Sequence, residues 1–246
     1  MTSTKLISNS DISAQVLGLT DKHIHFFEQA KKTDAKRSAN SNVLGIHQLM
    51  LSDFKALVSS AEKANINIKI ASGFRSFERQ LLIWNNKFMG KTLIKNIEGE
   101  PINISKLCDF EIIEAILLFS ALPGSSRHHW GCDIDIYAAN LLDGQTLQLE
   151  AWEYAPPGPM AKLSSWLDNN AGKHGFYFPY DSFRGGVAAE PWHLSYAPLA
   201  KQYQSALSVD LLQDLLLQTN IGGKEVIIKN LSIIFKRYIN NVNTIK

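Results

Sequence analysis

The sequence predicts an α+β protein: a small, mainly antiparallel sheet surrounded by helices, with a helical C-terminal extension. Two short stretches, residues 66–71 and 132–137, alternate apolar and polar side chains with the period of two that indicates a half-buried strand. Longer stretches around them carry apolar residues at helical spacing. After residue 200 the composition changes to Leu- and Ile-rich helical patterns. Together these observations favour a mixed fold that ends in helices.

The first half of the chain gives an arm and the start of the main domain. Residues 1–50 are polar and weakly periodic, and we expect an N-terminal arm with one helix over Asp21–Lys32. The main domain is predicted over residues 51–200. It opens with an amphipathic helix in LSDFKALVSSAEKANI, for which Ser52 is the candidate N-cap. The half-buried strand at 66–71 follows it.

Further elements are expected along the rest of the chain. They are a helix over Phe77–Phe88 ending near Gly90, a helix in FEIIEAILLF, the strand CDIDIY, a helix over Met160–Asn170 and a strand in GFYFPY. The extension, residues 201–246, should hold two helices separated by Gly222 and Gly223. These two helices are expected to form a hairpin.

The composition excludes several classes of protein. Lys and Arg number 25 against 23 Asp and Glu, so no overall field favours nucleic acid as a partner. The sequence contains no run of about 18 apolar residues, so it predicts no membrane-spanning helix. The first twenty residues lack the apolar segment of a secretory leader, so we expect a cytoplasmic protein, or a periplasmic or cell-envelope one if a leader was removed. Cys108 and Cys132 are expected to be buried thiols, with one disulfide as the alternative.

Two separated motifs carry residues suited to a metal. In SRHHWGCDID, Ser126, His128, Gly131 and Asp135 follow the pattern S-x-H-x-x-G-x-x-x-D. Downstream, EPWH has the pattern E-x-x-H, which ends on His193. Two imidazoles and one carboxylate suit zinc, because they leave the ion partly uncompensated with a fourth position open for water. The motifs therefore predict a catalytic zinc site.

Strand periodicity limits which side chains can face this site, but it does not identify all of the ligands. In a strand from Cys132, Asp133 and Asp135 share one face, and the apolar residues between them share the other. Parity alone cannot choose between the two carboxylates as the ligand. Glu190 and His193 are an odd number of residues apart, so a regular strand would separate them. Because Pro191 cannot donate a ladder hydrogen bond, we expect the strand to begin after it and Glu190 to lie on a bend.

The sequence resembles the zinc D-alanyl-D-alanine carboxypeptidases and dipeptidases, including those of vancomycin resistance, and the related peptidoglycan L,D-carboxypeptidases. The resemblance spans roughly residues 65–198 and rests on SGFRSFERQ, SRHHWGCDID and EPWHLSY, which occur in the family's order. It implies the following roles: His128, Asp135 and His193 as ligands of one Zn²⁺ per chain, Glu190 as general base, Arg75 at the oxyanion, and Ser126 and Gln80 at the substrate. Only the resemblance favours Asp135 over Asp133.

Two departures from the family pattern, Phe74 in place of Tyr and Cys132 after Gly131, bear on specificity. Arg127 is a further polar candidate for binding the substrate's carboxylate, because it lies next to the predicted ligand His128. His129 is expected to be structural or to support the ligands. His23, His25, His47 and His174 are interpreted as surface or structural residues.

The predicted function is removal of the C-terminal D-amino acid from peptidoglycan stem peptides, as a D,D- or L,D-carboxypeptidase. A muropeptide or stem peptide is therefore the expected partner. One alternative is a peptidoglycan endopeptidase or endolysin, which needs a longer cleft and usually a wall-binding module. The other is a non-catalytic zinc-binding domain, which the presence of Glu190 disfavours.

Overall fold

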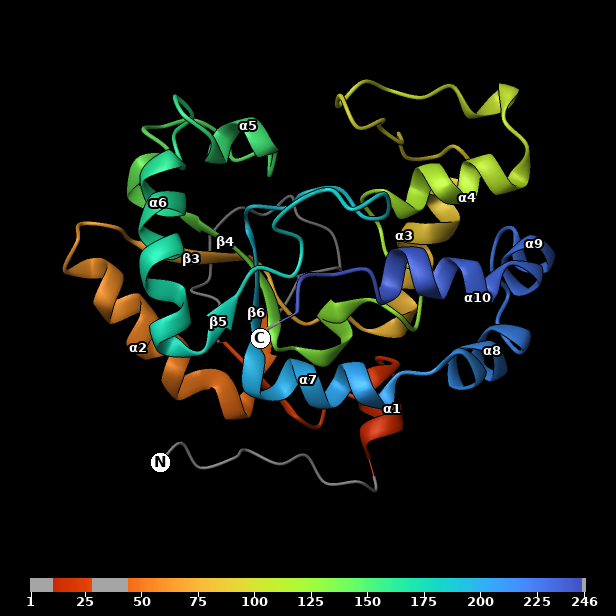
Figure 1. Ribbon diagram of the computed structural model, residues 1–246, viewed down its shortest axis with the longest axis horizontal. Helices are drawn as coiled ribbons and strands as arrows, with labels where there is room; N and C mark the ends of the chain where they lie inside the picture. The colour runs from red at the N-terminus through yellow and green to blue at the C-terminus, as the bar shows by residue number, and fades with distance from the viewer. Residues whose placement is uncertain (1–10, 28–43, 245–246) are drawn as a thin grey trace, which may run out of the picture.

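The fold is described by a computed structural model over residues 11–27 and 44–244 (Figure 1). The strands in these ranges are β1 (Ile24–Phe26), β2 (Gly45–His47), β3 (Ile68–Ser72), β4 (Asp133–Ala138), β5 (Phe176–Tyr177) and β6 (His193–Tyr196). The α-helices are α1 (Ile12–Val16), α2 (Leu51–Glu62), α3 (Phe77–Phe88), α4 (Asp109–Leu117), α5 (Ala151–Tyr154), α6 (Ala161–Asn170), α7 (Ala197–Ala206), α8 (Val209–Leu217), α9 (Lys224–Lys229) and α10 (Leu231–Ile234). The remaining helical turns include η1 (Gln48–Met50), η3 (Arg127–Trp130) and the π-helical η6 (Phe235–Ile239).

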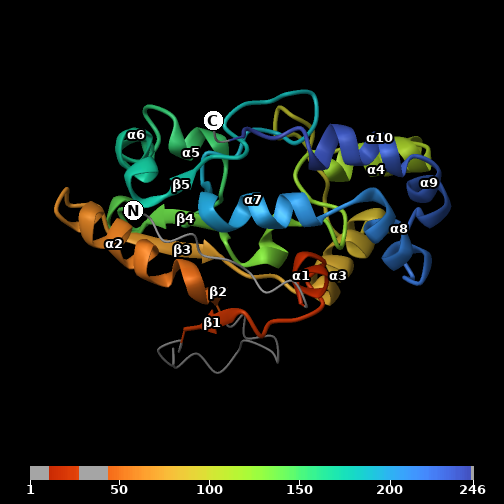
Figure 2. The same cartoon turned by 60° about the horizontal axis from the view of Figure 1, so that its bottom comes forward.

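The central sheet has the strand order β3-β4-β6-β5, and every neighbouring pair in it is antiparallel. A second, two-stranded antiparallel sheet is formed by β1 and β2. Helices α2 and α6 lie at one end of the central sheet, and α3, α4 and α8 to α10 gather at the other (Figures 1 and 2). The predicted α+β class with a small antiparallel sheet is therefore confirmed.

Two of the predicted helices show how far local sequence sets their limits. The helix predicted over Phe77–Phe88 is α3, whose N-cap Ser76 accepts a hydrogen bond from the Arg79 backbone at 3.3 Å. It stops before Gly90, which has a φ of +70°. Helix α2 begins one residue before Ser52, because η1 leads directly into it. Ser52 therefore lies in the first turn and is not the cap.

The helix predicted over Asp21–Lys32 is wrong in its described part. Residues Ile24–Phe26 form β1 and pair with Gly45–His47. Residues 28–32 lie outside the described residues. The strand depends on a partner about twenty residues away, and a local pattern does not show such a partner.

The extension is helical as predicted but has more pieces. The second expected helix divides at Asn230 into α9 and α10, and continues into η6. Buried residues from the arm, the middle segment and the extension belong to one apolar core, for example Val16, Ile134 and Leu231. The division at residues 50 and 200 stays a prediction. No helix among the described residues is long and apolar enough to cross a membrane.

Both cysteines are free thiols. Cys132 is buried as expected, whereas Cys108 is exposed at the start of α4, so the prediction of a buried thiol is wrong there. Burial raises the pKa of the Cys132 thiol well above its usual value. That residue therefore behaves as a small apolar side chain beside Asp133.

Candidate metal centre

A tight turn brings the first motif into position. His128 lies in η3, and Gly131 ends that turn with a φ of +67°. A Cβ atom at Gly131 would lie 2.3 Å from Ile24 Cδ1 and 3.1 Å from the His47 backbone nitrogen. Only glycine fits both this conformation and this contact. The turn lets the chain reverse from His128 into β4, so that Asp135 comes back beside it.

Strand pairing brings in the second motif. The register between β4 and β6 places Asp135 opposite His193. Asp133 and Asp135 both contact the His193 ring, whereas Ile134 and Ile136 are fully buried. The predicted two-residue alternation of β4 is confirmed.

The bend predicted before β6 is also present. β6 begins at His193, two residues after Pro191, and the His193 backbone N–H donates to the Glu190 carbonyl at 3.0 Å. This turn directs both side chains to one place. The Glu190 Oε2 atom lies 3.5 Å from His193 Nδ1.

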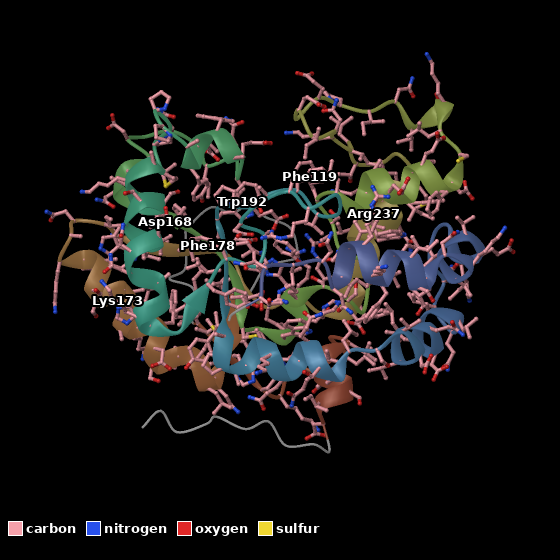
Figure 3. The ribbon with its side chains drawn as sticks, viewed as in Figure 1. Phe119, Asp168, Lys173, Phe178, Trp192 and Arg237 are labelled. Atoms are coloured by element: carbon pink, nitrogen blue, oxygen red, sulfur yellow. The ribbon has the colours of Figure 1, made fainter. Side chains whose placement is uncertain are left out.

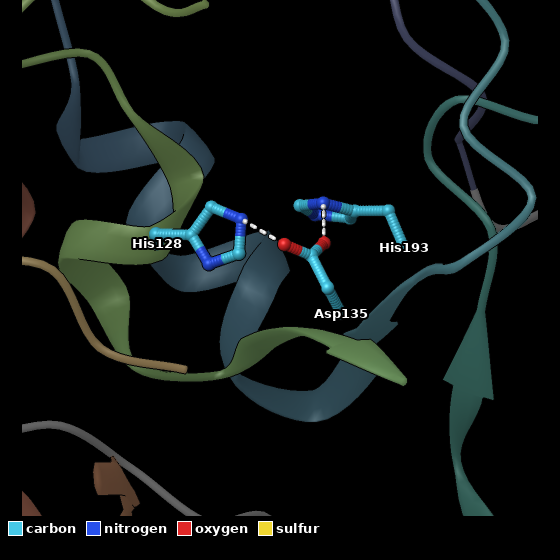
Figure 4. A group of neighbouring side chains, drawn as sticks. All are labelled: His128, Asp135 and His193. Carbon is cyan, nitrogen blue, oxygen red and sulfur yellow. Dashed lines mark ion pairs between the residues drawn. The ribbon is translucent and has the colours of Figure 1, made fainter. Parts of the chain in front are cut away.

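Hydrogen bonds on the outer side of each imidazole fix its orientation. His128 Nδ1 donates to the Gly73 carbonyl at 2.9 Å, and His193 Nε2 donates to Asp133 Oδ1 at 3.0 Å. Since a carbonyl or carboxylate oxygen can only accept, the other nitrogen of each neutral ring carries a lone pair. These are His128 Nε2, 3.4 Å from Asp135 Oδ2, and His193 Nδ1, 3.1 Å from Asp135 Oδ1 (Figure 4).

This arrangement fits a metal ion. Two imidazole lone pairs and one carboxylate face one another, and their ligand atoms all lie within 4.8 Å. Among the described residues, neither Asp135 Oδ1 nor His193 Nδ1 has a hydrogen-bond partner, although both are buried. A bound metal ion would give these atoms a partner, and buried polar atoms without partners are costly. The donor set and the supporting hydrogen bonds fit a zinc ion.

The charges around this point are strongly coupled. Burial opposes ionisation of Asp135, but His128 and His193 hold its pKa well below its usual range. Burial, reinforced by Asp135, raises the pKa of Glu190 to about 7, although His193 and Arg75 oppose the rise. A bound divalent cation would lower that pKa from about 7. The Glu190 carboxylate would then be ionised near neutral pH, as a general base requires.

Arg75 is held against the site from two sides. Its guanidinium donates to Gln80 Oε1 at 2.9 Å and Ser72 Oγ at 3.2 Å. Its carbonyl accepts from His129 Nδ1 at 2.6 Å. His129 is buried, and its Nε2 accepts from the Gly124 backbone, so it ties the Arg75 segment to the loop before η3. The structural reading of His129 fits this geometry.

Gln80 is fully buried, and both the oxygen and the nitrogen of its side-chain amide form hydrogen bonds within the protein. It accepts from Arg75 and donates to the Ala121 carbonyl at 2.7 Å. These contacts orient Arg75. The predicted contact of Gln80 with substrate stays a prediction.

Arg127 was expected to bind the substrate's carboxylate, but in the structure it hydrogen-bonds to side chains of the protein. It is buried, and four hydrogen bonds join it to Asp133, Gln204, Tyr177 and Ser195. The closest is from Nε to Asp133 Oδ1 at 2.7 Å. Burial alone would lower the pKa of Arg127, but Asp133 and the neighbouring tyrosines raise it above its usual value. Arg127 therefore holds Asp133, which in turn holds His193.

The sequence left Asp133 as a possible metal ligand, but in the structure it lies outside the group of candidate ligands. It accepts from His193, Arg127 and Ser195, at 3.0, 2.7 and 3.0 Å. Its role as the partner that fixes His193 was missed, because neither Arg127 nor Ser195 shows its pairing in the sequence. The alternating pattern that placed Asp133 on the site's face was the one available signal.

A cavity of about 370 Å³ opens over the candidate ligands. Its walls include Trp192 and Phe119, which lie near the middle of the molecule in Figure 3. Ser126 lines it as predicted, and no hydrogen bond of its side chain is seen among the described residues. Tyr238 and Ile239 of η6 also line it. The extension therefore forms part of the wall.

The end of the extension also supports the loop that leads to Glu190. The Asn243 backbone donates to the Pro179 carbonyl at 2.8 Å, and the Asn241 side chain donates to the Arg184 carbonyl at 2.8 Å. Glu190 closes the loop by donating from its backbone to the Tyr180 carbonyl at 2.9 Å. Residues far apart in sequence thus fix the segment that carries this carboxylate.

The fold and the site define an α+β protein with a buried His–Asp–His group, suited to hold a metal ion, next to a carboxylate. The profile of the VanY family, described as D-alanyl-D-alanine carboxypeptidase, matches residues 44–199, which include all three motifs. The chain belongs to this family.

Similar proteins include an uncharacterised protein of Haemophilus influenzae, which is 39% identical over 121 residues, or 48% of this chain and 92% of that protein. A structure of VanYB in complex with D-alanine-D-alanine has a TM-score of 0.45 and 21% identity, and covers 77% of this chain and 93% of its own. A structure of the LD-carboxypeptidase LdcB has a TM-score of 0.49 and 20% identity, with coverage of 91% and 80%.

Proposed function

We propose that this chain is a zinc-dependent carboxypeptidase that removes the C-terminal D-amino acid from a peptidoglycan stem peptide. Membership of the VanY family supports the reaction class. The observation that carries the zinc assignment is the convergence of His128 Nε2, His193 Nδ1 and the Asp135 carboxylate, each oriented by its own contacts. One zinc ion per chain is proposed at this place.

When bound, zinc would act as a Lewis acid that polarises the scissile carbonyl and lowers the pKa of water. Glu190 takes a proton from the attacking water and passes it to the leaving amine. Its carboxylate is placed for this work beside His193. Arg75, held by Gln80 and Ser72, stabilises the negative charge that develops on the carbonyl oxygen.

Ser126 is proposed to bind the substrate from the cavity wall. Arg127 is not proposed as a substrate contact, because four of its bonds are already made within the protein. The expectation of a cytoplasmic location stays a prediction. Cell fractionation with a specific antibody tests it.

The direct test uses defined stem peptides. Zinc-loaded protein is incubated with pentapeptide and tetrapeptide muropeptides, and the products are weighed by mass spectrometry. Loss of one terminal D-alanine is expected from at least one of the two. Loss from the pentapeptide indicates D,D-activity, and loss from the tetrapeptide indicates L,D-activity. Cleavage inside the stem or the cross-link with no terminal release would contradict the proposal and favour an endopeptidase.

Glu190→Gln tests the assigned base. This variant keeps the shape of the side chain but cannot accept the proton at neutral pH. Its kcat should fall by about 10²- to 10⁴-fold, the usual contribution of a positioned proton-transfer group, while its zinc content stays unchanged. His193→Ala provides the contrast, because it should lose both zinc and activity. A Glu190→Gln variant with kcat within a few-fold of wild type would show that another residue is the base.

A further inference from the structure

A lysine that the motifs do not include points into the same cavity. Lys87 lies near the end of α3, seven residues after Gln80 and so on the same side of the helix. It is half-buried and lines the cavity together with His128 and Glu190. Its Nζ donates to Ser120 Oγ at 2.7 Å.

The charge of Lys87 has no direct counterion. Among the described residues, no carboxylate oxygen lies within 4.0 Å of Lys87 or Arg75, and the partners of both are neutral. By contrast, Arg127 has Asp133 at 2.7 Å. Two cations of this cavity therefore lack a paired carboxylate. Partly buried charges are normally paired, so the arrangement favours an anionic ligand.

The overall charge of the cavity leads to the same conclusion. Lys95 pairs with Glu150, and Arg127 pairs with Asp133; the other Asp, Glu, Lys and Arg side chains of the lining are Asp135, Glu190, Arg75 and Lys87. A divalent metal ion adds further positive charge. The loaded cavity is thus net positive, which favours binding of a negatively charged group.

The titration of Lys87 agrees with this. Burial lowers its pKa, and Arg75 lowers it further, whereas Glu190 raises it. Holding the charge of Lys87 therefore costs free energy in the empty cavity. A carboxylate that arrives beside it would offset part of that cost.

The position of Lys87 relative to Glu190 indicates which carboxylate this is. Glu190 returns its proton to the leaving amine, so the leaving residue lies on the side of Glu190. Lys87 and Glu190 line the same cavity of about 370 Å³. In an α-amino acid a single carbon separates the amine from the carboxylate. A cation that shares this cavity with the base is therefore placed to meet the free carboxylate of the leaving residue.

We propose that Lys87, held by Ser120, binds the terminal carboxylate of the peptide substrate and so restricts the enzyme to cleavage at a free C-terminus. This inference rests on the proposed function. It assigns Arg75 to the oxyanion and Lys87 to the terminus, while Arg127 serves the fold. Phe119, Ala121 and Leu122 add a small apolar wall to the same cavity, which suits a methyl side chain such as that of alanine.

The experiment compares a stem peptide with a free terminal carboxylate and the same peptide with a C-terminal amide. Lys87→Met should lower kcat/KM for the free acid by about 10- to 100-fold, the effect of losing a hydrogen bond between charged groups, mostly through KM. Its rate on the amide should equal that of wild type. Lys91→Met is the matched control, since Lys91 is exposed just after α3 and does not line the cavity. Lys87→Gln repeats the test if Lys87→Met folds poorly.

Equal losses of Lys87→Met on the acid and the amide would overturn the inference, as would no loss on either. A binding measurement separates this result from failure of the proposed function. Zinc-loaded Glu190→Gln, with and without Lys87→Met, is titrated calorimetrically with both peptides. If wild type releases no terminal residue, the proposed function fails, yet a preference for the acid that requires Lys87 would still support the inference. Equal affinity for acid and amide in the presence of Lys87 would contradict it.

Discussion

Two groups of cationic side chains border the same cavity and are used in opposite ways. On the side of β4 and β6, Arg127 is buried against Asp133 and donates to three further partners. On the side of α3, Arg75 and Lys87 have only neutral hydrogen-bond partners among the described residues. The first group is complete within the protein, whereas the second requires an anion from outside. The difference separates side chains that build the site from those available to a ligand.

Proximity in sequence does not show how these cations are paired. Arg127 adjoins the candidate ligand His128, yet its guanidinium faces Asp133. Lys87 is distant from every motif that carries a ligand, yet it lines the cavity. What decides is the presence of a carboxylate partner, and this is set by packing between β4, β6 and α7. A buried cation that is already paired is a poor candidate for substrate binding.

The largest expected effect comes from breaking the Arg127–Asp133 ion pair. Arg127→Met leaves Asp133 buried without its counterion, which should destabilise the fold by about 3–5 kcal/mol. Arg75→Met removes a cation without a counterion and loses only hydrogen bonds to neutral acceptors, at a cost of about 1–2 kcal/mol. Denaturant unfolding of both variants in the same zinc buffer measures the difference. Equal destabilisation would show that the two sides of the cavity do not differ in this way.

The next effect concerns how the complete group serves the metal. Asp133→Asn weakens the acceptor that fixes His193, so zinc affinity should fall by about 10- to 100-fold. Asp135→Asn should cost more, because it removes a ligand. Competition with a chromogenic chelator measures both affinities, and Asp168→Asn is the control, because Asp168 is exposed on α6 and does not line the cavity. A larger loss with Asp133→Asn than with Asp135→Asn would reverse the two assignments.

The last effect concerns a buried basic group that lies outside the cavity lining. His23 is packed against His47, Phe74 and Tyr203, and burial lowers its pKa to about 4. Its pKa in the folded state lies below the unfolded value near 6.5, so the unfolded chain takes up the proton first as pH falls. The stability that neutral His23 allows is present above pH 6.5 and declines toward pH 4, by at most about 1.4 kcal/mol per pH unit.

His23→Phe should flatten this decline, as measured by denaturant unfolding at several pH values. His25→Gln is the control, because His25 is an exposed histidine of β1, two residues after His23. An unchanged pH dependence in His23→Phe would mean that His23 is not the group responsible. His23 would then not be an example of a buried basic side chain that stays neutral in the folded protein.

Elements and residues with strong local signals could be identified before the fold was known. The alternating residues of β4, the limits of α3 and the proline before β6 depend on neighbours along the chain, and all three predictions were confirmed. The candidate ligands His128, Asp135 and His193 were identified by motif, and the structure brings them together. Such features can be read because they are set by backbone geometry over a few residues.

Only the tertiary structure decided how the polar groups are paired. It converted the start of the predicted helix at Asp21 into a strand, because Ile24–Phe26 meets β2. It separated Asp135, which faces both imidazoles, from Asp133, which faces Arg127 and the outer nitrogen of His193. It left Lys87 without a carboxylate in the cavity. The charge state and availability of a buried side chain depend on the partners that packing brings within about 4 Å, and these come from distant parts of the chain.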